Sequence, residues 1–93
     1  MAEDKRVVVV TGGSRGIGRV VAVRLAGPGT VVCYNYHRSN DTVAEETGRL
    51  IEHAGGRAWA DRVDVSSNGD VKGFFDRIVD RHGRVAVLGN NAG

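Results

Sequence analysis

The stretch Val7-Val8-Val9-Val10-Thr11-Gly12-Gly13-Ser14-Arg15-Gly16-Ile17-Gly18 passes from an apolar run through a glycine-rich turn into a helical pattern. Four consecutive valines are typical of a strand that is buried on both faces. Apolar side chains then recur with helical spacing over residues 16–25, at Ile17, Val20, Val21 and Leu25. Because a helix N-terminus offers unpaired N–H groups and a partial positive charge, a turn with so little side-chain bulk predicts a pyrophosphate site.

The glycines of this turn have separate predicted roles. Gly12 allows a sharp turn at the end of the strand, Gly16 allows a phosphate to approach the backbone, and Gly18 allows the helix to pack closely on the strand. A glycine-rich turn taken alone can also be a plain loop. Its functional interpretation therefore depends on the other motifs of the chain.

Two further motifs follow in order, Asp64-Val65 and Asn90-Asn91-Ala92-Gly93. Together with Thr-Gly-x-x-x-Gly-x-Gly at residues 11–18, they resemble the short-chain dehydrogenase/reductase family. That family carries the glycine motif after its first strand and the acidic–apolar pair at the end of its third strand, and Asn-Asn-Ala-Gly is a further motif of the family. The resemblance covers the whole chain but only the first part of that fold. One departure is Gly89, where the family usually has a branched apolar residue, and a glycine there loosens the strand.

The length and composition limit the possible classes. The chain has 93 residues, of which 41% are hydrophobic and 26% charged, so we expect a soluble globular protein of one domain at most. Residues 1–93 are expected to form the N-terminal dinucleotide-binding portion of a single Rossmann-fold domain. The net charge is +2, and the basic residues are scattered from Arg6 to Arg84 with few aromatic residues among them. This distribution argues against nucleic acid as a partner.

Metal and membrane roles are also disfavoured. Cys33 is the only cysteine and lies in an apolar run, so we expect a buried thiol in a reducing compartment. His37, His53 and His82 are far apart and lack the spacing of metal ligands. No apolar segment has membrane-spanning length, and no long apolar core follows the amino terminus, so we expect a cytoplasmic protein without a membrane partner.

The remaining pattern alternates strands and helices. Strands are predicted over 30–34, 57–65 and 85–88, and the strand over 57–65 is expected near a sheet edge with Trp59 as a packing residue. A second helix is predicted up to His53, with one face formed by Val43, Thr47, Leu50, Ile51 and Ala54. A third follows N-cap oxygens at residues 66–68 and ends at Gly83, with a stripe toward the sheet formed by Val71, Phe74, Phe75, Ile78 and Val79.

The order βαβαβαβ predicts the α/β class, as an incomplete Rossmann-like fold. Right-handed crossovers give a parallel sheet with strand order 3-2-1-4 and helices on both faces. The strand order reverses between strands 1 and 4, so a dinucleotide is expected above the carboxyl ends of these two strands.

The end of the second strand predicts the choice of cofactor. Dinucleotide folds usually place an acidic residue there, about 20 positions after the glycines, to bind the ribose hydroxyls. Residues 35–39 contain no carboxylate but include Arg38, and Arg15 lies in the glycine turn. Because an arginine pairs with the 2′-phosphate of NADP that a carboxylate would repel, the sequence favours NADP over NAD. Alternatively, both arginines are solvated surface charges.

The family resemblance adds further site residues. It implies that the Asp64 carboxylate and the Val65 backbone contact the adenine, although Asp64 alternatively only caps the following turn. The complete set of predicted cofactor-binding residues is Gly12, Ser14, Arg15, Gly16, Ile17, Gly18, Arg38, Asp64, Val65, Asn90, Ala92 and Gly93. No metal-binding residue is predicted.

No catalytic residue is predicted in this chain. Enzymes of the resembled family use a serine and a Tyr-x-x-x-Lys pair located beyond Asn-Asn-Ala-Gly, whereas Tyr34 is followed at the fourth position by Arg38 and Tyr36 by Asn40. The resemblance therefore implies the cofactor-binding half of an NADP(H)-dependent carbonyl reductase, inactive by itself.

The resemblance also extends to substrate and assembly. The residues around Asn35-Tyr36 and Gly83 are most similar to 3-oxoacyl-acyl-carrier-protein reductases, so the expected substrate of the full-length parent is a small-molecule or carrier-bound carbonyl compound. The same resemblance implies a homo-oligomeric parent. The alternatives are a non-catalytic nucleotide-binding module and an inactive truncated fragment.

Overall fold

The computed structural model describes residues 6–12, 16–36, 41–64 and 66–90. Its strands are β1 (Arg6–Thr11), β2 (Thr30–Tyr36), β3 (Arg57–Arg62) and β4 (Val85–Asn90), and its helices are α1 (Gly16–Leu25), α2 (Asp41–His53) and α3 (Asn68–His82). The strands are all parallel and form one sheet in the order β3-β2-β1-β4. The predicted α/β architecture and strand order are confirmed.

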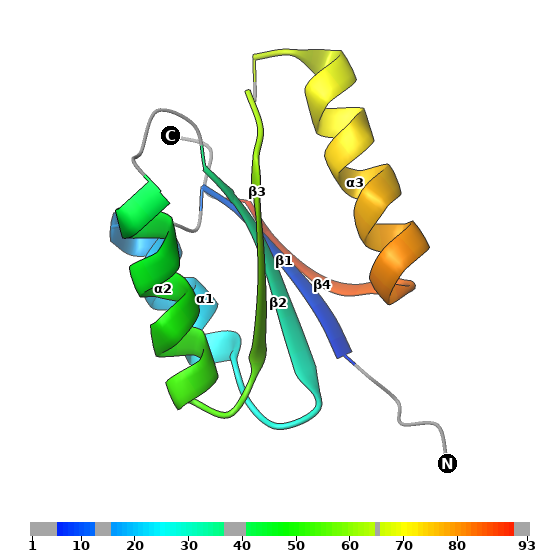
Figure 1. Ribbon diagram of the computed structural model, residues 1–93. Coiled ribbons are helices and arrows are strands. Elements are labelled where there is room, and N and C mark those ends of the chain that lie inside the picture. The colour runs from blue at the N-terminus through cyan, green and yellow to red at the C-terminus, as the bar shows by residue number, and fades with distance from the viewer. Residues whose placement is uncertain (1–5, 13–15, 37–40, 65, 91–93) are drawn as a thin grey trace.

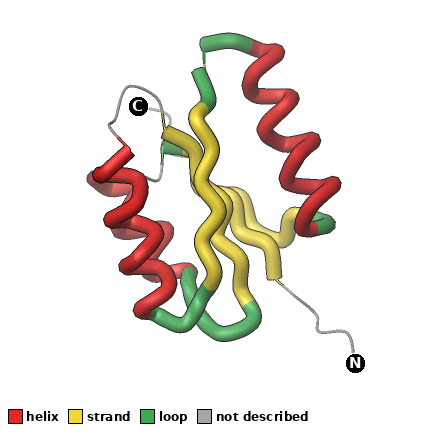
Figure 2. The backbone as a smooth tube through the Cα atoms, viewed as in Figure 1, coloured by secondary structure: helices red, strands yellow, loops and turns green. Residues whose placement is uncertain are grey.

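The helices enclose the sheet from both sides. Figure 1 shows α1 and α2 on one face and α3 on the other, and Figure 2 shows the same sheet between the two helical layers. The chain moves outward from β1 through β2 to β3 on one side and then returns across the opposite face to β4. This reversal places the carboxyl ends of β1 and β4 next to each other.

Successive side chains of the central strands supply two separate cores. Val7, Val9, Val31 and Cys33 face α3 and pack with Phe74 and Ile78, among others. Val8, Val10, Val32 and Tyr34 face the other layer and pack with Ala22, Ala44 and Ile51. The four valines of β1 are each at most 1% exposed, which confirms that this strand is buried on both faces.

The third helix is delimited by the residues that the sequence predicts. Ser67 is the N-cap, with extended backbone angles, and its Oγ accepts a hydrogen bond from the Asp70 N–H at 3.2 Å. Gly83 ends the helix with φ 101°, and its N–H donates to the carbonyl of Val79. Trp59 of β3 stacks on Phe74, with ring centroids 6.0 Å apart, so its predicted packing role is confirmed.

The buried faces of the helices differ in part from the predicted ones. On α1, Ile17 and Val20 are 73% and 59% exposed, and the buried positions are Gly18 and Ala22. These two small residues allow the helix to lie close to the sheet, which turns the larger residues outward. Of the predicted stripe, Val21 and Leu25 do pack against the core, whereas the prediction is wrong for Ile17 and Val20.

The other two helices show the same kind of correction. On α2 the buried residues are Ala44, Thr47 and Ile51, whereas Leu50 and also Ala54, which follows the end of the helix, are exposed. On α3, Phe74 and Ile78 are buried and Val71 and Phe75 are partly buried, but Val79 is 54% exposed. The face of the helix that contacts the sheet is therefore narrower than the predicted stripe. The strand bounds differ as well: β2 and β4 extend beyond the predicted ends, and β3 ends earlier, at Arg62.

Candidate functional site

The turn between β1 and α1 begins and ends in backbone conformations that favour glycine. Gly12 has φ 69° and Gly16, the first residue of α1, has φ 63°. A Cβ added to Gly16 would have no heavy atom within 4 Å, so the space beside this helix start is open. The first turn of α1 contains no acidic residue that would neutralise the partial positive charge of the helix N-terminus.

The end of β4 lies directly beside this turn. Thr11, the last residue of β1, is in register with Asn90, the last residue of β4, and Val10 is in register with Gly89. The fold thus brings the glycine turn and the start of the Asn-Asn-Ala-Gly motif to one edge of the sheet. A Cβ added to Gly89 would meet Val21 and Val10 side-chain carbons at 3.6 and 3.8 Å, which is ordinary contact.

Asn35 is a residue of this edge that the sequence reasoning did not identify as functional. It lies near the end of β2 and is only 1% exposed. Its Oδ1 accepts a hydrogen bond from the N–H of Gly12 at 2.6 Å. The available signal was an amide residue continuing a run of buried strand residues, because asparagine is depleted in strands.

Two more polar side chains, those of Arg19 on α1 and Tyr34 on β2, connect these elements to α2. The Arg19 Nε of α1 donates to Thr47 Oγ1 at 2.8 Å, and its Nη2 donates to the Val43 carbonyl at 3.3 Å and lies 3.4 Å from the Glu46 carboxylate. The hydroxyl of Tyr34 donates to the carbonyl of Ala44 at 2.6 Å. Neither contact was predicted from the sequence.

Burial raises the pKa of Tyr34 to about 12, with a smaller contribution from the negative charge of Glu52. The side chain is 1% exposed, so its ionised form would be poorly solvated. The neutral hydroxyl is therefore the form that donates to Ala44.

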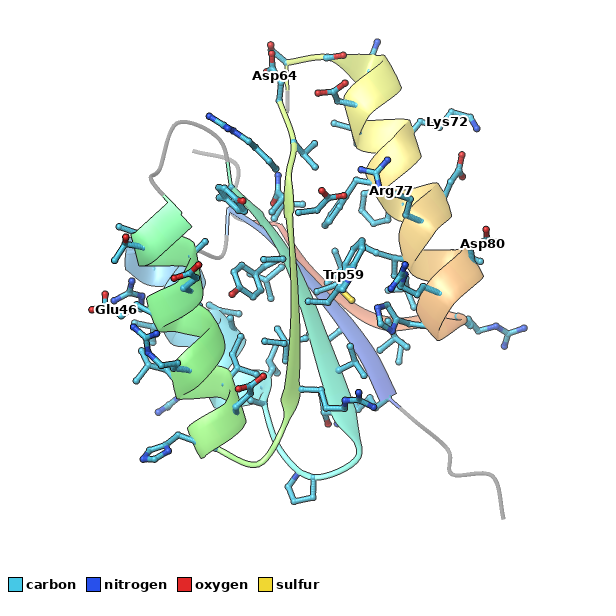
Figure 3. All side chains as sticks on the ribbon, viewed as in Figure 1. Glu46, Trp59, Asp64, Lys72, Arg77 and Asp80 are labelled. Carbon is cyan, nitrogen blue, oxygen red and sulfur yellow. The ribbon has the colours of Figure 1, made fainter. Side chains whose placement is uncertain are left out.

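Asp64 lies beyond the end of β3, two strands away from the glycine turn, and is labelled at the upper end of that strand in Figure 3. Its Oδ1 accepts hydrogen bonds from the Ser66 N–H at 3.0 Å and from the Ser66 hydroxyl at 2.6 Å, and its own N–H donates to Asp70. This arrangement corresponds to the capping role considered as an alternative. Contact with an adenine stays a prediction.

The remaining predicted site residues divide into two groups. Gly12, Gly16, Ile17, Gly18, Asp64 and Asn90 belong to the described part of the chain, and the first four lie at or directly after the glycine turn. The other six, Ser14, Arg15, Arg38, Val65, Ala92 and Gly93, lie outside the described residues.

A hollow of about 500 Å³ lies elsewhere, between α2 and the outer part of the sheet. Its walls include Tyr34, Tyr36, Gly48, Ala58 and Ala60, so it exists because small residues of α2 and β3 face each other. It is not at the glycine turn. Among the described residues no group of three metal-ligating side chains gathers at one place, and none of the helices combines the length and hydrophobicity needed to cross a bilayer.

The amino-acid sequence is similar to a known protein family and to individual members of it. A family model described as short chain dehydrogenase matches residues 6–93. The chain is 46% identical over 87 residues to the short-chain dehydrogenase/reductase homolog YusS of Bacillus subtilis, covering 94% of this chain and 79% of that protein. It is also 46% identical over 88 residues to 3beta-hydroxysteroid dehydrogenase 1 of Eggerthella lenta, covering 95% of this chain and 33% of that protein.

A solved structure of a short-chain oxidoreductase is also similar to this chain over most of its length. A metagenomic short-chain oxidoreductase in complex with NADP matches with a TM-score of 0.86 and 35% identity, over 98% of this chain and 40% of the other. Apart from YusS, the chain spans only about a third of the length of four curated relatives that it matches, from 32% to 36%.

Proposed function

Because the chain belongs to the short-chain dehydrogenase/reductase family, we propose that it forms the cofactor-binding half of an NADP(H)-dependent oxidoreductase. The reaction is hydride transfer between a nicotinamide and a carbonyl or alcohol substrate. The observation that carries the proposal is the turn between β1 and α1, where Gly12 and Gly16 adopt positive φ at an open helix N-terminus beside Asn90. The NADP-bound solved relative supports the choice of cofactor class.

The chain's own residues have defined roles in this proposal. The glycine turn and the start of α1 bind the pyrophosphate through backbone N–H groups. Arg15 and Arg38 pair with the 2′-phosphate, and Asp64 with Val65 holds the adenine. The bound cofactor supplies or accepts the hydride. The serine and the Tyr-x-x-x-Lys pair that complete the site in the family are absent from these 93 residues, so we expect this chain alone to bind without catalysing.

The finer assignments follow from the resemblance of particular segments. The residues around Asn35-Tyr36 and Gly83 are similar to those of 3-oxoacyl-acyl-carrier-protein reductases, which supports a 3-oxoacyl thioester as the substrate class of the full-length parent. The same family resemblance supports a homo-oligomeric parent. The buried thiol of Cys33 supports a reducing compartment such as the cytoplasm.

A non-catalytic nucleotide-binding module is the second candidate, because the glycine turn at the start of α1 is a feature that binds nucleotides and does not itself carry out chemistry. The coding sequence after Gly93 separates the two. A serine followed by Tyr-x-x-x-Lys would support the reductase, whereas a stop codon would support the module.

The test of the cofactor assignment is calorimetric titration of the chain with NADP⁺ and with NAD⁺. We expect tighter binding of NADP⁺, and a loss of about 10–100-fold in its affinity in Arg38→Ala, because one charge-assisted hydrogen bond contributes about 1.5–3 kcal/mol. Arg24→Ala removes an exposed arginine from the other end of α1 and serves as the control. Equal affinities for the two cofactors, or an equal effect of both substitutions, would refute the assignment.

A further inference from the structure

The hydrogen bond between Asn35 and Gly12 joins two parts of the proposed site that come from different strands. Gly12 is the first residue after β1, and Asn35 stands next to the last residue of β2, 23 positions later in the chain. The donor–acceptor distance of 2.6 Å is short for an N–H donor, and the side chain is 1% exposed. A buried acceptor at this distance fixes the position of the Gly12 peptide.

The hydrogen bond to Asn35 also determines how Gly12 takes part in the proposed phosphate site. Its N–H is donated to Asn35, so it is not a donor to phosphate in this arrangement. Its φ of 69° turns the chain away from β1, and the Asn35 amide holds that turned conformation. The contact thereby positions the Gly12 end of the turn relative to β2.

The residue type at position 35 has a second consequence. Dinucleotide folds commonly place a carboxylate near the end of the second strand. A carboxylate could also accept the Gly12 hydrogen bond, but it would add a negative charge that repels the 2′-phosphate of NADP. An asparagine accepts the same bond through Oδ1 and remains neutral.

We propose that Asn35 is a positioning and specificity residue: its side-chain amide holds the Gly12 end of the phosphate turn without the charge that would exclude a 2′-phosphorylated dinucleotide. The proposal rests on the proposed function. It assigns the two roles to one side chain, so two different substitutions separate them. Asn35→Leu removes the acceptor, and Asn35→Asp keeps the acceptor and adds the charge.

The control is Tyr34→Phe. Tyr34 is the neighbouring residue of the same strand, equally buried at 1% exposure, and its side chain also makes a 2.6 Å hydrogen bond, but to Ala44 of α2. A purely structural role of Asn35 would give the same pattern of effects in both positions. A positioning role would not.

The first measurement is amide hydrogen exchange of Gly12 in the ¹⁵N-labelled chain without ligand. In Asn35→Leu we expect the Gly12 N–H to exchange at least about fivefold faster than in Tyr34→Phe, after normalisation to the amides of β1, because only the former loses the acceptor. Asn35→Asp should keep the wild-type protection. Unchanged Gly12 exchange in Asn35→Leu would overturn the proposal.

The second measurement is calorimetric titration of the same variants with NADP⁺ and NAD⁺. We expect Asn35→Leu to weaken both cofactors by about tenfold, and Asn35→Asp to lower the ratio of NADP⁺ to NAD⁺ affinity by about tenfold or more, with Tyr34→Phe changing neither by more than about twofold. An unchanged ratio in Asn35→Asp would overturn the specificity role. If the wild-type chain binds neither cofactor, the proposed function is wrong and the cofactor role falls with it, while Gly12 exchange still decides whether Asn35 holds the turn.

Discussion

Tyr34 shows how a single polar atom in the core is tolerated. The ring packs between the sheet and α2, and the hydroxyl donates to the Ala44 carbonyl at 2.6 Å. Ionisation would leave a poorly solvated phenolate facing a carbonyl oxygen, and burial therefore raises the pKa of Tyr34 to about 12. The side chain therefore stabilises the fold only while it is protonated.

The free energy of unfolding should fall as the pH rises from about 10 to about 12. The unfolded chain loses the tyrosine proton near its ordinary pKa of about 10 and the folded chain only near 12, so in this window the folded state binds more protons and alkali favours unfolding. Urea titrations at pH 8, 10 and 11.5 measure this slope. In Tyr34→Phe the slope should be smaller, with about 1 kcal/mol lost at pH 8; an unchanged slope would contradict the assignment.

Gly16 and Gly29 provide a matched pair for the phosphate turn. Both have positive φ, 63° and 78°, and a Cβ at either would have no heavy atom within 4 Å. Valine should therefore cost each position a similar backbone strain of about 1–2 kcal/mol. Only Gly16→Val, at the start of α1, should abolish NADP⁺ binding in calorimetry, because Gly29 precedes β2 at the opposite end of the sheet. Normal binding by Gly16→Val would mean that the phosphate lies elsewhere.

At the scale of the elements, α2 and α3 each carry an internal glycine with a close neighbour. A Cβ at Gly48 of α2 would lie 3.1 Å from the Tyr34 hydroxyl, and a Cβ at Gly73 of α3 would lie 3.1 Å from Arg77 Nη1. The tyrosine is buried and hydrogen-bonded. Arg77 is half-exposed, points from α3 toward the sheet in Figure 3, and pairs with Asp61 through both Nε, at 2.9 Å, and Nη2.

These neighbours should decide the sign of two alanine substitutions. Gly73→Ala should raise the free energy of unfolding by about 0.5–1 kcal/mol, because the arginine head can shift and the helix gains the usual preference for alanine. Gly48→Ala should give no gain, because the Tyr34 hydroxyl cannot move freely. Adding Gly48→Ala to Tyr34→Phe should restore the gain, and a double-mutant cycle by urea unfolding measures it; strictly additive effects would contradict the argument.

The elements also show what could be predicted from the sequence. The order of strands and helices followed from apolar runs, glycine stops and the Ser67 cap, because these signals are local. The buried faces of α1 and α2 followed only in part. Gly18, Thr47 and Ile51 were expected on them and are buried, whereas Ala22 and Ala44 were not expected, because small residues become packing positions only when a helix approaches the sheet. Asn35 and Arg19 act on residues 23 to 28 positions away, and such partners are set by strand register and helix placement.

At the scale of the whole molecule, the outer strand β3 and the outer sides of the helices differ in how well they resist association with other chains. Along β3, Arg57, Asp61 and Arg62 place charges on the edge, which discourages pairing with another strand. On the helical layers, Ile17, Val20 and Val79 are 73%, 59% and 54% exposed. Apolar side chains exposed to this extent favour association with other chains.

We therefore expect this chain to associate as its concentration rises. Under the proposed function, and with no Tyr-x-x-x-Lys pair among its 93 residues, we also expect it to show no ketone-dependent oxidation of NADPH. The double variant Val20→Lys with Val79→Lys should lower the associated fraction in sedimentation velocity and change stability by no more than about 0.5 kcal/mol for each substitution, since both side chains are mainly exposed. Leu50→Lys, on α2, is the control and should matter less. A monodisperse wild-type monomer with reductase activity would contradict both expectations.

Because Cys33 is buried, the rate at which a thiol reagent modifies it reports on the stability of the fold. This side chain is 0% exposed within the layer between the sheet and α3, and the sequence has no other cysteine. A thiol reagent can modify it only after the sheet opens, so its labelling rate should be lower than that of the unfolded chain by about the unfolding equilibrium constant. Saturating NADP⁺ should slow labelling further, by a factor of about one plus the ratio of free ligand to Kd. Cofactor affinity could thus be measured by alkylation and mass spectrometry, without activity, dye or engineered label.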